Sequence, residues 1–280
     1  MKQKIIPAVI ILAGFLLLSY PFVSNFIFER SAGSTVKSYQ KKTAGMDQKE
    51  KEKAIDEARQ YNVDLTRSEV QLTDPFKAKK SNGGMLFYNR VLDLDSSGIM
   101  GYVKIPCICV DLPIYHGTSA EVLEYGIGHL AASSFPVGGK STHAVLTGHT
   151  GLSSAKLFTD LTEMKKGDLF FIHILDHKLA YKVDQIMVVK PEDTRNLQII
   201  DGEDHVTLLT CTPYGVNDHR LLVRGVRTTY HEKEEQTKAR KHHSQWMEVY
   251  KRAILAGLLI ILVLIFLRKG YEKIRGRRRP

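Results

Sequence analysis

The chain has 280 residues, of which 43% are hydrophobic, so it can supply a sizeable folded core and further apolar segments. Its formal net charge of +10 reflects 40 Lys and Arg against 30 Asp and Glu, but 16 of the basic and 6 of the acidic residues lie outside residues 31–230. The central part therefore carries 24 charges of each sign, which excludes the basic folded face that a nucleic-acid-binding domain needs.

Apolar runs stand near both ends of the chain. At the N-terminus (residues 1–30), the run Ile5 to Phe28 follows two lysines without a clean small-residue cleavage site, so a signal anchor is favoured over a cleaved signal peptide. Residues 253–267 are uniformly apolar between cations, which favours a transmembrane segment over a buried helix. The basic residues 268–280 then predict a cytoplasmic tail. Both termini would lie inside and the middle of the chain outside.

Residues 31–97 predict a helical linker followed by an extended segment. Residues 46–61 are rich in helix formers and place Ala54, Ile55 and Ala58 at helical spacing. Further on, Pro75 biases Asp74 away from helical backbone, which indicates a turn or extended loop at Asp74-Pro75-Phe76. By composition alone, that loop is an ordinary surface turn with a half-buried Phe76.

Residues 98–230 predict one β-rich domain. Short apolar runs alternate there with Gly, Pro, Asp and Asn, which is typical of a compact antiparallel sheet or barrel. Few helices are expected there, chiefly at residues 119–124 and 155–161. The strand runs are residues 101–110, 112–118, 144–147, 168–174, 179–183, 185–189, 206–209 and 221–223.

The chain has three cysteines, at positions 107, 109 and 211. We expect Cys107 and Cys109 to lie on one strand, on the face shared with Val103 and Ile105, as buried core thiols. A disulfide between them would be badly strained, and no further ligands stand nearby to make a metal site. No metal, phosphate loop or other cofactor is therefore expected.

The third cysteine lies in the most informative stretch of the chain, Val206 to Gly225. Two apolar runs flank a turn-rich segment, which predicts two antiparallel strands joined by a loop. Cys211 ends the first strand and Arg220 opens the second, so the thiol and the guanidinium become near neighbours. Because a cation beside a thiol favours the thiolate, this pair predicts a nucleophile.

A cysteine nucleophile needs an imidazole as general acid and base. Of the eleven histidines, His149 is the best candidate because it follows the predicted strand 144–147 in a Gly-flanked turn, where catalytic groups are commonly displayed. His219, next to Arg220, is the second candidate and is expected to support a substrate loop.

The stretch from Thr210 to Gly225 resembles the signature of the sortases, the cysteine transpeptidases of Gram-positive cell surfaces, and its form is similar to class C, the pilin-polymerising sortases. The segment Ser153 to Phe158 also resembles the one after the family's catalytic histidine, although Thr150 stands where relatives often have Arg. The resemblance implies an eight-stranded β-barrel with short helices between flanking transmembrane helices. It also implies catalytic Cys211, His149 and Arg220, and a lid at Asp74-Pro75-Phe76 in which Phe76 covers Cys211 and Asp74 pairs with Arg220.

The same resemblance implies a substrate class. Cys211 would attack a Leu-Pro-x-Thr-Gly-like sorting signal and transfer the acyl group to a pilin lysine amine at the outer face of the cell membrane. The resulting domain plan is anchor 1–30, linker and lid 31–97, barrel 98–230, basic linker 231–252, membrane segment 253–267 and tail 268–280. Two alternatives stay open: a housekeeping sortase that anchors proteins to cell-wall peptide, and a non-catalytic membrane scaffold.

Overall fold

The computed structural model describes residues 2–67, 72–76, 85–236 and 245–276. The chain divides into two compact units, residues 21–242 and residues 1–20 with 243–280, and each is described by itself. Part of the predicted basic linker (residues 237–244) and the end of the predicted tail (residues 277–280) lie outside the described residues.

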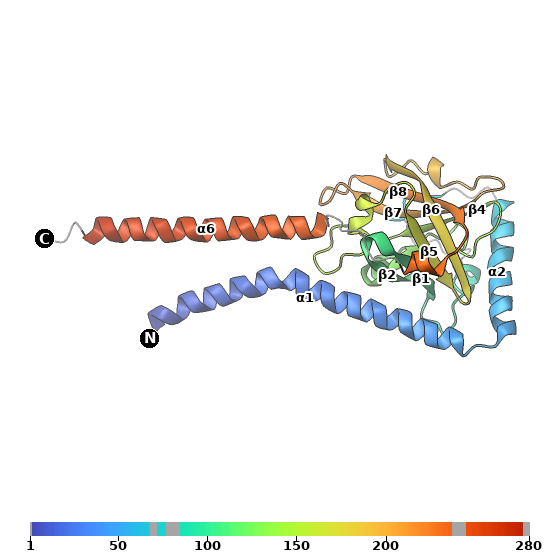
Figure 1. Ribbon diagram of the computed structural model, residues 1–280, viewed down its shortest axis with the longest axis horizontal. Coiled ribbons are helices and arrows are strands. Elements are labelled where there is room, and N and C mark those ends of the chain that lie inside the picture. The colour runs from blue at the N-terminus through green and yellow to red at the C-terminus, as the bar shows by residue number, and fades with distance from the viewer. Residues whose placement is uncertain (1, 68–71, 77–84, 237–244, 277–280) are drawn as a thin grey trace. The chain divides into compact units, whose positions relative to one another are not determined.

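Eight strands form a closed barrel in the larger unit (Figure 1). The order around the barrel is β1-β2-β3-β4-β7-β8-β6-β5, and the pairs β2·β3 and β4·β7 are parallel while the others are antiparallel. The expected mostly-β, eight-stranded fold is therefore confirmed. The strands are β1 (Ile99–Ile105), β2 (Val110–His116), β3 (Ile127–His129), β4 (Thr142–Thr147), β5 (Leu169–Ile174), β6 (His177–Val189), β7 (Asp204–Thr212) and β8 (His219–Thr228).

Alternation along the strands separates two apolar clusters. In β4, Ala144 and Leu146 belong to the main barrel core, whereas Val145 belongs to a second, smaller cluster on the other face. This alternation is the two-residue period of a β-strand. The second cluster covers the barrel face on which Cys211 lies; its buried members are Leu72, Leu130, Val145, Val189, Leu197, Leu209 and Leu222.

Most of the described helices between the two ends of the chain are short, and the exception is the 19-residue α2 (Gln48–Thr66). The helix expected at residues 119–124 is α4 (Ala120–Tyr125), which begins after Ser119, whose hydroxyl accepts the N–H of Val122. The helix expected at residues 155–161 is instead a 3-10 turn at Thr159–Glu163. Apart from α6 (Gln245–Gly276), which belongs to the smaller unit, the remaining described helices are α1 (Lys2–Ala44), α3 (Met85–Tyr88), α5 (Glu232–Glu235) and the 3-10 turns Pro106–Ile108 and Arg195–Leu197.

The predicted linker helix is α2, and it is fastened to the barrel domain. The buried Asn62 amide donates to the carbonyl of Phe135 (3.0 Å) and accepts the N–H of Phe135 (2.7 Å). Tyr61 packs edge-on against the Phe135 ring, with centroids 4.8 Å apart. A two-way amide bond and an aromatic contact therefore fix α2, and with it the start of the segment that leads to Asp74-Pro75-Phe76.

The prediction for Cys107 and Cys109 was wrong. Pro106 opens a 3-10 turn that ends β1, because proline lacks the N–H that would continue a strand ladder. Cys109 closes this turn in the left-handed region (φ 55°) and is exposed, and Cys107 is only half-buried. Cys107 packs against the main core while remaining partly exposed, and Cys109 does not, so neither is the fully buried thiol that the apparent strand alternation suggested.

The smaller unit contains the beginning of α1 and the helix α6 (Gln245–Gly276). Within the part of the chain that the structure describes, no helix meets the combined length and hydropathy requirement for crossing a membrane. The flanking transmembrane helices expected at residues 1–30 and 253–267 are therefore unsupported. The apolar run at 253–267 is shorter than the roughly 20 residues of a typical span, and Pro7 and Pro21 interrupt the first run.

Candidate active site

Cys211 and Arg220 are directly opposite each other in the antiparallel pair β7·β8. The intervening turn is closed by the N–H groups of Val216 and Asn217, which both donate to the carbonyl of Pro213 (3.1 and 3.0 Å). Nη1 of Arg220 donates a hydrogen bond to the carbonyl of Asn217 at 3.1 Å, so the turn also orients the guanidinium. The sequence correctly predicted this juxtaposition, since it depends only on local pairing.

The parallel pair β4·β7 places His149 beside Cys211. Thr147 pairs with Leu209, and the N–H of Gly148 donates to the carbonyl of Leu209 at 3.1 Å, which continues the alignment beyond β4. Two residues further along each chain are His149 and Cys211. Since paired strands lie about 4.8 Å apart, this register brings the imidazole-bearing and thiol-bearing residues together.

The backbone around His149 is fixed on both sides. Before it, the buried Thr210 hydroxyl donates to the carbonyl of Gly148 at 2.7 Å. After it, the N–H of Phe158 donates to the carbonyl of His149 at 3.1 Å. A Cβ on Gly148 would approach the Phe158 ring to 2.8 Å, so only glycine allows this close packing. His149 is thus presented on a rigid strand exit, as the sequence led us to expect.

Asp74 pairs with Arg220 through two parallel hydrogen bonds. Nε and Nη2 of Arg220 donate to the two carboxylate oxygens of Asp74 at 2.9 and 2.7 Å. The side chain of Arg220 is only 7% exposed and that of Asp74 only 6%. Bidentate charge-assisted pairs of this kind are geometrically specific, and breaking a buried one by removing a single partner costs about 3–5 kcal/mol.

Phe76 lies between His149 and Arg220. Its ring centroid is 5.3 Å from that of His149, and the guanidinium carbon of Arg220 is 5.0 Å from the same centroid. The preceding Pro75 is held through its carbonyl, which accepts the Thr118 hydroxyl at 3.0 Å. The Asp74-Pro75-Phe76 motif therefore covers this site as a closed lid, and Leu72 seats it in the second apolar cluster.

With the lid closed, burial and Asp74 outweigh the effect of Arg220 on the pKa of the Cys211 thiol. Burial raises the pKa of Cys211 above its ordinary value, Arg220 lowers it, and Asp74 raises it again, with a net upward shift. Burial has the opposite effect on the imidazole and lowers the pKa of His149. Arg220 therefore favours the thiolate, as expected, but burial, which is the largest cause, and Asp74 together outweigh it, so the pKa of Cys211 is not lowered while the lid is closed.

His219, the second candidate imidazole, is engaged elsewhere. Its Nδ1 lies 2.8 Å from a carboxylate oxygen of Asp218. It pairs with Thr212 across the ladder, whereas Arg220 pairs with Cys211, so the two successive residues of β8 project to opposite faces.

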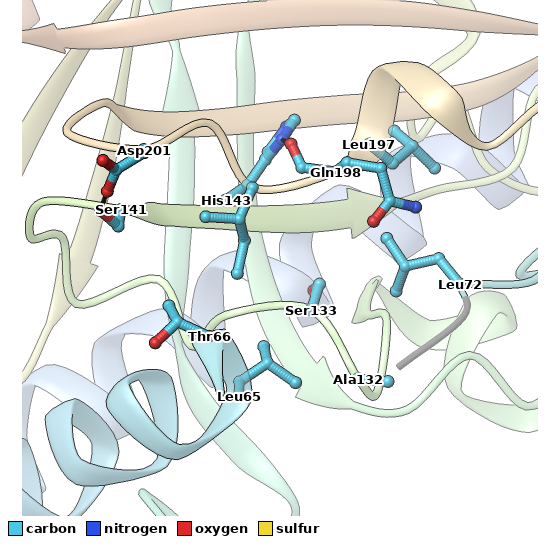
Figure 2. A pocket seen from close by; sticks show the side chains of 11 residues that line it. Leu65, Thr66, Leu72, Ala132, Ser133, Ser141, His143, Leu197, Gln198 and Asp201 are labelled. Atoms are coloured by element: carbon cyan, nitrogen blue, oxygen red, sulfur yellow. Dashed lines mark hydrogen bonds between the residues drawn. The ribbon is translucent and has the colours of Figure 1, made fainter. Parts of the chain in front are cut away.

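A cavity of about 330 Å³ adjoins the lid on the same side of β4 (Figure 2). Figure 2 shows Leu72 and Leu197 at one end and Ser141 with Asp201 at the other. His143 lies between them, with its Nδ1 2.8 Å from the carbonyl of Gln198. The cavity combines apolar and polar walls; it is lined by Leu65, Thr66, Leu72, Ala132, Ser133, Ser141, His143, Leu197, Gln198, Ile199 and Asp201.

Comparison with known proteins identifies the family. A model of the sortase domain matches residues 103–228, which hold most of the barrel. The crystal structure of sortase C-1 from Actinomyces oris is 47% identical, with a TM-score of 0.61, and the match covers 64% of this chain and 99% of that one. The chain belongs to the sortase family. Sortases are cysteine transpeptidases, so this protein is an enzyme of that type.

Other relatives agree. Streptococcus pneumoniae sortase C is 44% identical, with a TM-score of 0.66, over 70% of this sortase and 97% of that chain. Sortase A of Bacillus anthracis is 26% identical over 229 residues, which are 80% of this chain and 95% of that protein. The solved structures named here are thus class C sortases, as the resemblance of residues 210–225 implied.

Three residues of the site were not singled out from the sequence. Thr118 fastens the lid, Leu72 seats it, and Thr210 fixes the strand exit before His149. Thr210 adjoins Cys211 and could have been suspected for that reason. The other two depend on contacts between distant segments, for which no local pattern exists. Within the described ranges, no group of three or more His, Cys, Asp or Glu residues could hold a metal ion.

Proposed function

We propose that this sortase polymerises pilin subunits: it cleaves a Leu-Pro-x-Thr-Gly-like sorting signal and transfers the acyl group to a pilin lysine amine. The observation that carries the proposal is the closed Asp74-Pro75-Phe76 lid over Cys211 and Arg220. Support comes from the similarity to class C sortases, one of which, from Streptococcus pneumoniae, has a structure described as giving insight into pilin substrate specificity.

In this proposal Cys211 is the nucleophile. Its sulfur attacks the carbonyl carbon of the substrate Thr, the Thr–Gly C–N bond breaks, and His149 gives a proton to the departing amine. The acyl group is left as a thioester on Cys211. The lysine amine then attacks that carbonyl carbon and passes a proton to His149, and Cys211 departs as the thiolate. The acyl-bond energy is conserved in the thioester, so no nucleotide is needed.

In the same proposal, Arg220 donates hydrogen bonds to the carbonyl oxygen of the substrate. With the lid closed, its Nε and Nη2 are committed to Asp74, while Nη1 is bonded to backbone carbonyls. When Asp74 leaves, the first two donors become free beside Cys211. They can then bind the oxygen on which negative charge develops during attack, which is the arrangement that stabilises acyl-transfer transition states.

The cavity beside Leu72 supports an extended acyl donor. It lies along the face of β4 that runs from His149 back to His143, a distance of about 20 Å at about 3.3 Å per residue. A peptide bound at Cys211 along this face would reach the cavity with residues other than the scissile Thr. Its apolar wall suits an aliphatic side chain.

The lid favours polymerisation over the housekeeping alternative, in which a sortase anchors proteins to cell-wall peptide. An enzyme whose lid is bonded to Arg220 admits substrate only after the lid leaves, and this matches the class C resemblance. The scaffold alternative is disfavoured because the chain belongs to an enzyme family and pairs a buried cysteine with Arg220.

We also propose that the enzyme works at the cell membrane, with the catalytic domain on the outer side. Large apolar side chains are widely exposed on the two terminal helices, among them Phe15, Leu17, Leu255, Leu259 and Phe266. Exposed apolar stretches of this kind are typical of membrane or protein interaction surfaces. The basic C-terminal tail would add attraction to anionic lipids.

Mass spectrometry of the purified enzyme with a Leu-Pro-x-Thr-Gly peptide tests the proposed chemistry. The lid variant D74A/F76A is expected to gain the mass of the acyl fragment on Cys211, and C211A is expected to gain none. Adding a pilin domain with its acceptor lysine should then release the adduct as an isopeptide product. A lid variant whose Cys211 reacts with iodoacetamide but never with the peptide would refute the sorting-signal assignment.

A further inference from the structure

Thr147, the last residue of β4, has a buried hydroxyl without a hydrogen-bond partner among the described residues. The residue is 0% exposed. Other buried threonines nearby are satisfied: the hydroxyl of Thr207 lies 2.7 Å from Nε2 of His143, and that of Thr210 donates to the carbonyl of Gly148. Because native proteins pair nearly all buried polar atoms, the exception at Thr147 requires a physical reason.

Strand alternation places Thr147 on the barrel face that the lid covers. Val145, two residues earlier, belongs to the apolar cluster that contains Leu72 and packs against Phe76. Leu209, the partner of Thr147 on β7, belongs to the same cluster. Side chains two residues apart share a face of a strand. Thr147 therefore lies on the lid-covered face, two residues before His149, and its partner Leu209 lies two residues before Cys211.

The other neighbour of Thr147 leads to the lid as well. On β3, Thr147 pairs with Gly128, and a Cβ built on Gly128 would lie 3.3 Å from Cα of Thr118. The hydroxyl of Thr118 in turn donates to the carbonyl of Pro75. Contacts on both sides of Thr147 therefore connect it to lid residues.

We propose that Thr147 is a substrate-binding residue, whose hydroxyl hydrogen-bonds the main chain of the acyl-donor peptide after the lid has left. The inference rests on the proposed function and adds a specificity element to it. A hydroxyl can both donate and accept, and an extended peptide offers an N–H or a C=O at every residue. The side chains that the lid packs onto this face, Leu72 and Phe76, offer neither.

This difference also makes the lid displaceable. With the lid closed, the hydroxyl is removed from water without gaining a partner, and such desolvation opposes closure. A bound peptide restores the missing hydrogen bond. Thr147 therefore favours the open, substrate-bound enzyme over the closed one, which is the differential interaction that a substrate needs in order to shift the lid equilibrium.

The test compares Thr147→Val, which keeps the shape but loses the hydroxyl, with Thr147→Ser, which keeps the hydroxyl. Both changes are made in the full chain, in the parent and in the lid variant D74A/F76A. The readouts are the second-order rate of Cys211 acylation by a Leu-Pro-x-Thr-Gly peptide and the rate of Cys211 alkylation by iodoacetamide, each located by peptide mass spectrometry.

In the lid variant, Thr147→Val should lower the acylation rate about fivefold to tenfold, the range expected for one lost hydrogen bond, and leave alkylation unchanged. Thr147→Ser should stay within about twofold of the lid variant. With the lid intact, Thr147→Val should slow alkylation, because lid closure then no longer buries a hydroxyl that lacks a hydrogen-bond partner. Equal acylation by Thr147→Val and its parent would overturn the inference alone, whereas a parent that never acylates would overturn the proposed function and the inference with it.

Discussion

The Cys211 thiol shows how a single carboxylate can control a nucleophile. Arg220 alone would lower the pKa of the thiol, but burial and Asp74 raise it by a larger amount. Asp74 acts in two ways, since its charge opposes the thiolate and its pair with Arg220 keeps the lid closed. Both effects disappear together when the lid opens, so opening the site and activating the nucleophile are one event.

Replacing Asp74 by Asn should therefore move the pH dependence of Cys211 alkylation downward. The negative charge that raises the pKa is removed, and the weakened lid exposes the thiol to water, which lowers the pKa further. The thiolate is then present at lower pH than in the parent. The measurement is the iodoacetamide alkylation rate of the Cys211 peptide against pH, followed by mass spectrometry because Cys107 and Cys109 also react.

The matched control is Asp218→Asn. Asp218 is an exposed carboxylate close to Arg220 in sequence, but its partner is His219 and it does not contribute to the Cys211 shift. Its removal should leave the alkylation midpoint unchanged. A midpoint that stays in place or rises in Asp74→Asn would show that Asp74 does not oppose the thiolate.

At the scale of elements, the lid is a short segment held by three kinds of contact. Asp74 gives a buried ion pair, Pro75 accepts a hydrogen bond from Thr118, and Phe76 packs between His149 and Arg220. Leu72 adds an apolar anchor in the second cluster. Asp74 and Phe76 contact the reactive residues Arg220 and His149, whereas Leu72 packs in the second cluster, so Leu72 offers a way to loosen the lid without altering the chemistry.

Leu72→Ala should speed Cys211 alkylation at neutral pH by at least about tenfold. Truncating a buried leucine costs about 2–5 kcal/mol, and here the cost falls on the closed lid because Leu72 belongs to it. Val63→Ala, an exposed apolar change on α2, is the control and should leave the rate unchanged. The thermal midpoint of the barrel should stay close to that of the parent. Unchanged labelling would contradict the role of Leu72 as an anchor.

The sequence predicts elements well where contacts are local. The β7 and β8 pair, the Cys211 and Arg220 juxtaposition and α4 follow from apolar runs and turn residues only a few positions apart. The Cys107 and Cys109 strand was wrong because alternation was given more weight than Pro106, which ends β1. A short-range pattern cannot show which of two competing local rules the tertiary structure will satisfy.

Long-range placements are harder to predict. Nothing in the spacing of His149 and Cys211 reveals that β4 and β7 are parallel neighbours with Thr147 opposite Leu209. Strand β3 was missed because it has only three residues, which is too short to give a recognisable apolar run. The lid was expected from the family resemblance, but Thr118 and Leu72 as its supports required the folded chain.

At the scale of the whole molecule, the catalytic domain extends beyond the barrel strands. Tyr39 of α1 donates to the carbonyl of Met100 and accepts the N–H of Leu175, both at 2.9 Å. After the last strand, Glu235 of α5 pairs with Lys104 at 3.1 Å and accepts the hydroxyl of Tyr230. A piece that keeps these contacts must therefore run from about residue 31 to residue 236.

Residues 31–236 should be catalytically competent but unable to bind membranes. This piece retains the site and its supports and lacks the exposed apolar side chains of the terminal helices, among them Phe15, Leu17, Leu255, Leu259 and Phe266. In flotation assays with anionic phospholipid vesicles, the full chain should rise with the lipid and residues 31–236 should remain at the bottom. Both should form the Cys211 acyl adduct at rates within a few fold once D74A/F76A opens the lid.

The contribution of each end can then be separated. A chain of residues 31–280 keeps α6 and the basic tail, so its flotation should weaken as salt rises, because salt screens the attraction between exposed charges and anionic lipid beyond about 10 Å at 0.1 M. A chain of residues 1–236 keeps only the N-terminal apolar run and should float independently of salt. Flotation of residues 31–236 as efficient as that of the full chain would contradict membrane attachment through the terminal helices, because the piece that floats would then be the catalytic domain without them.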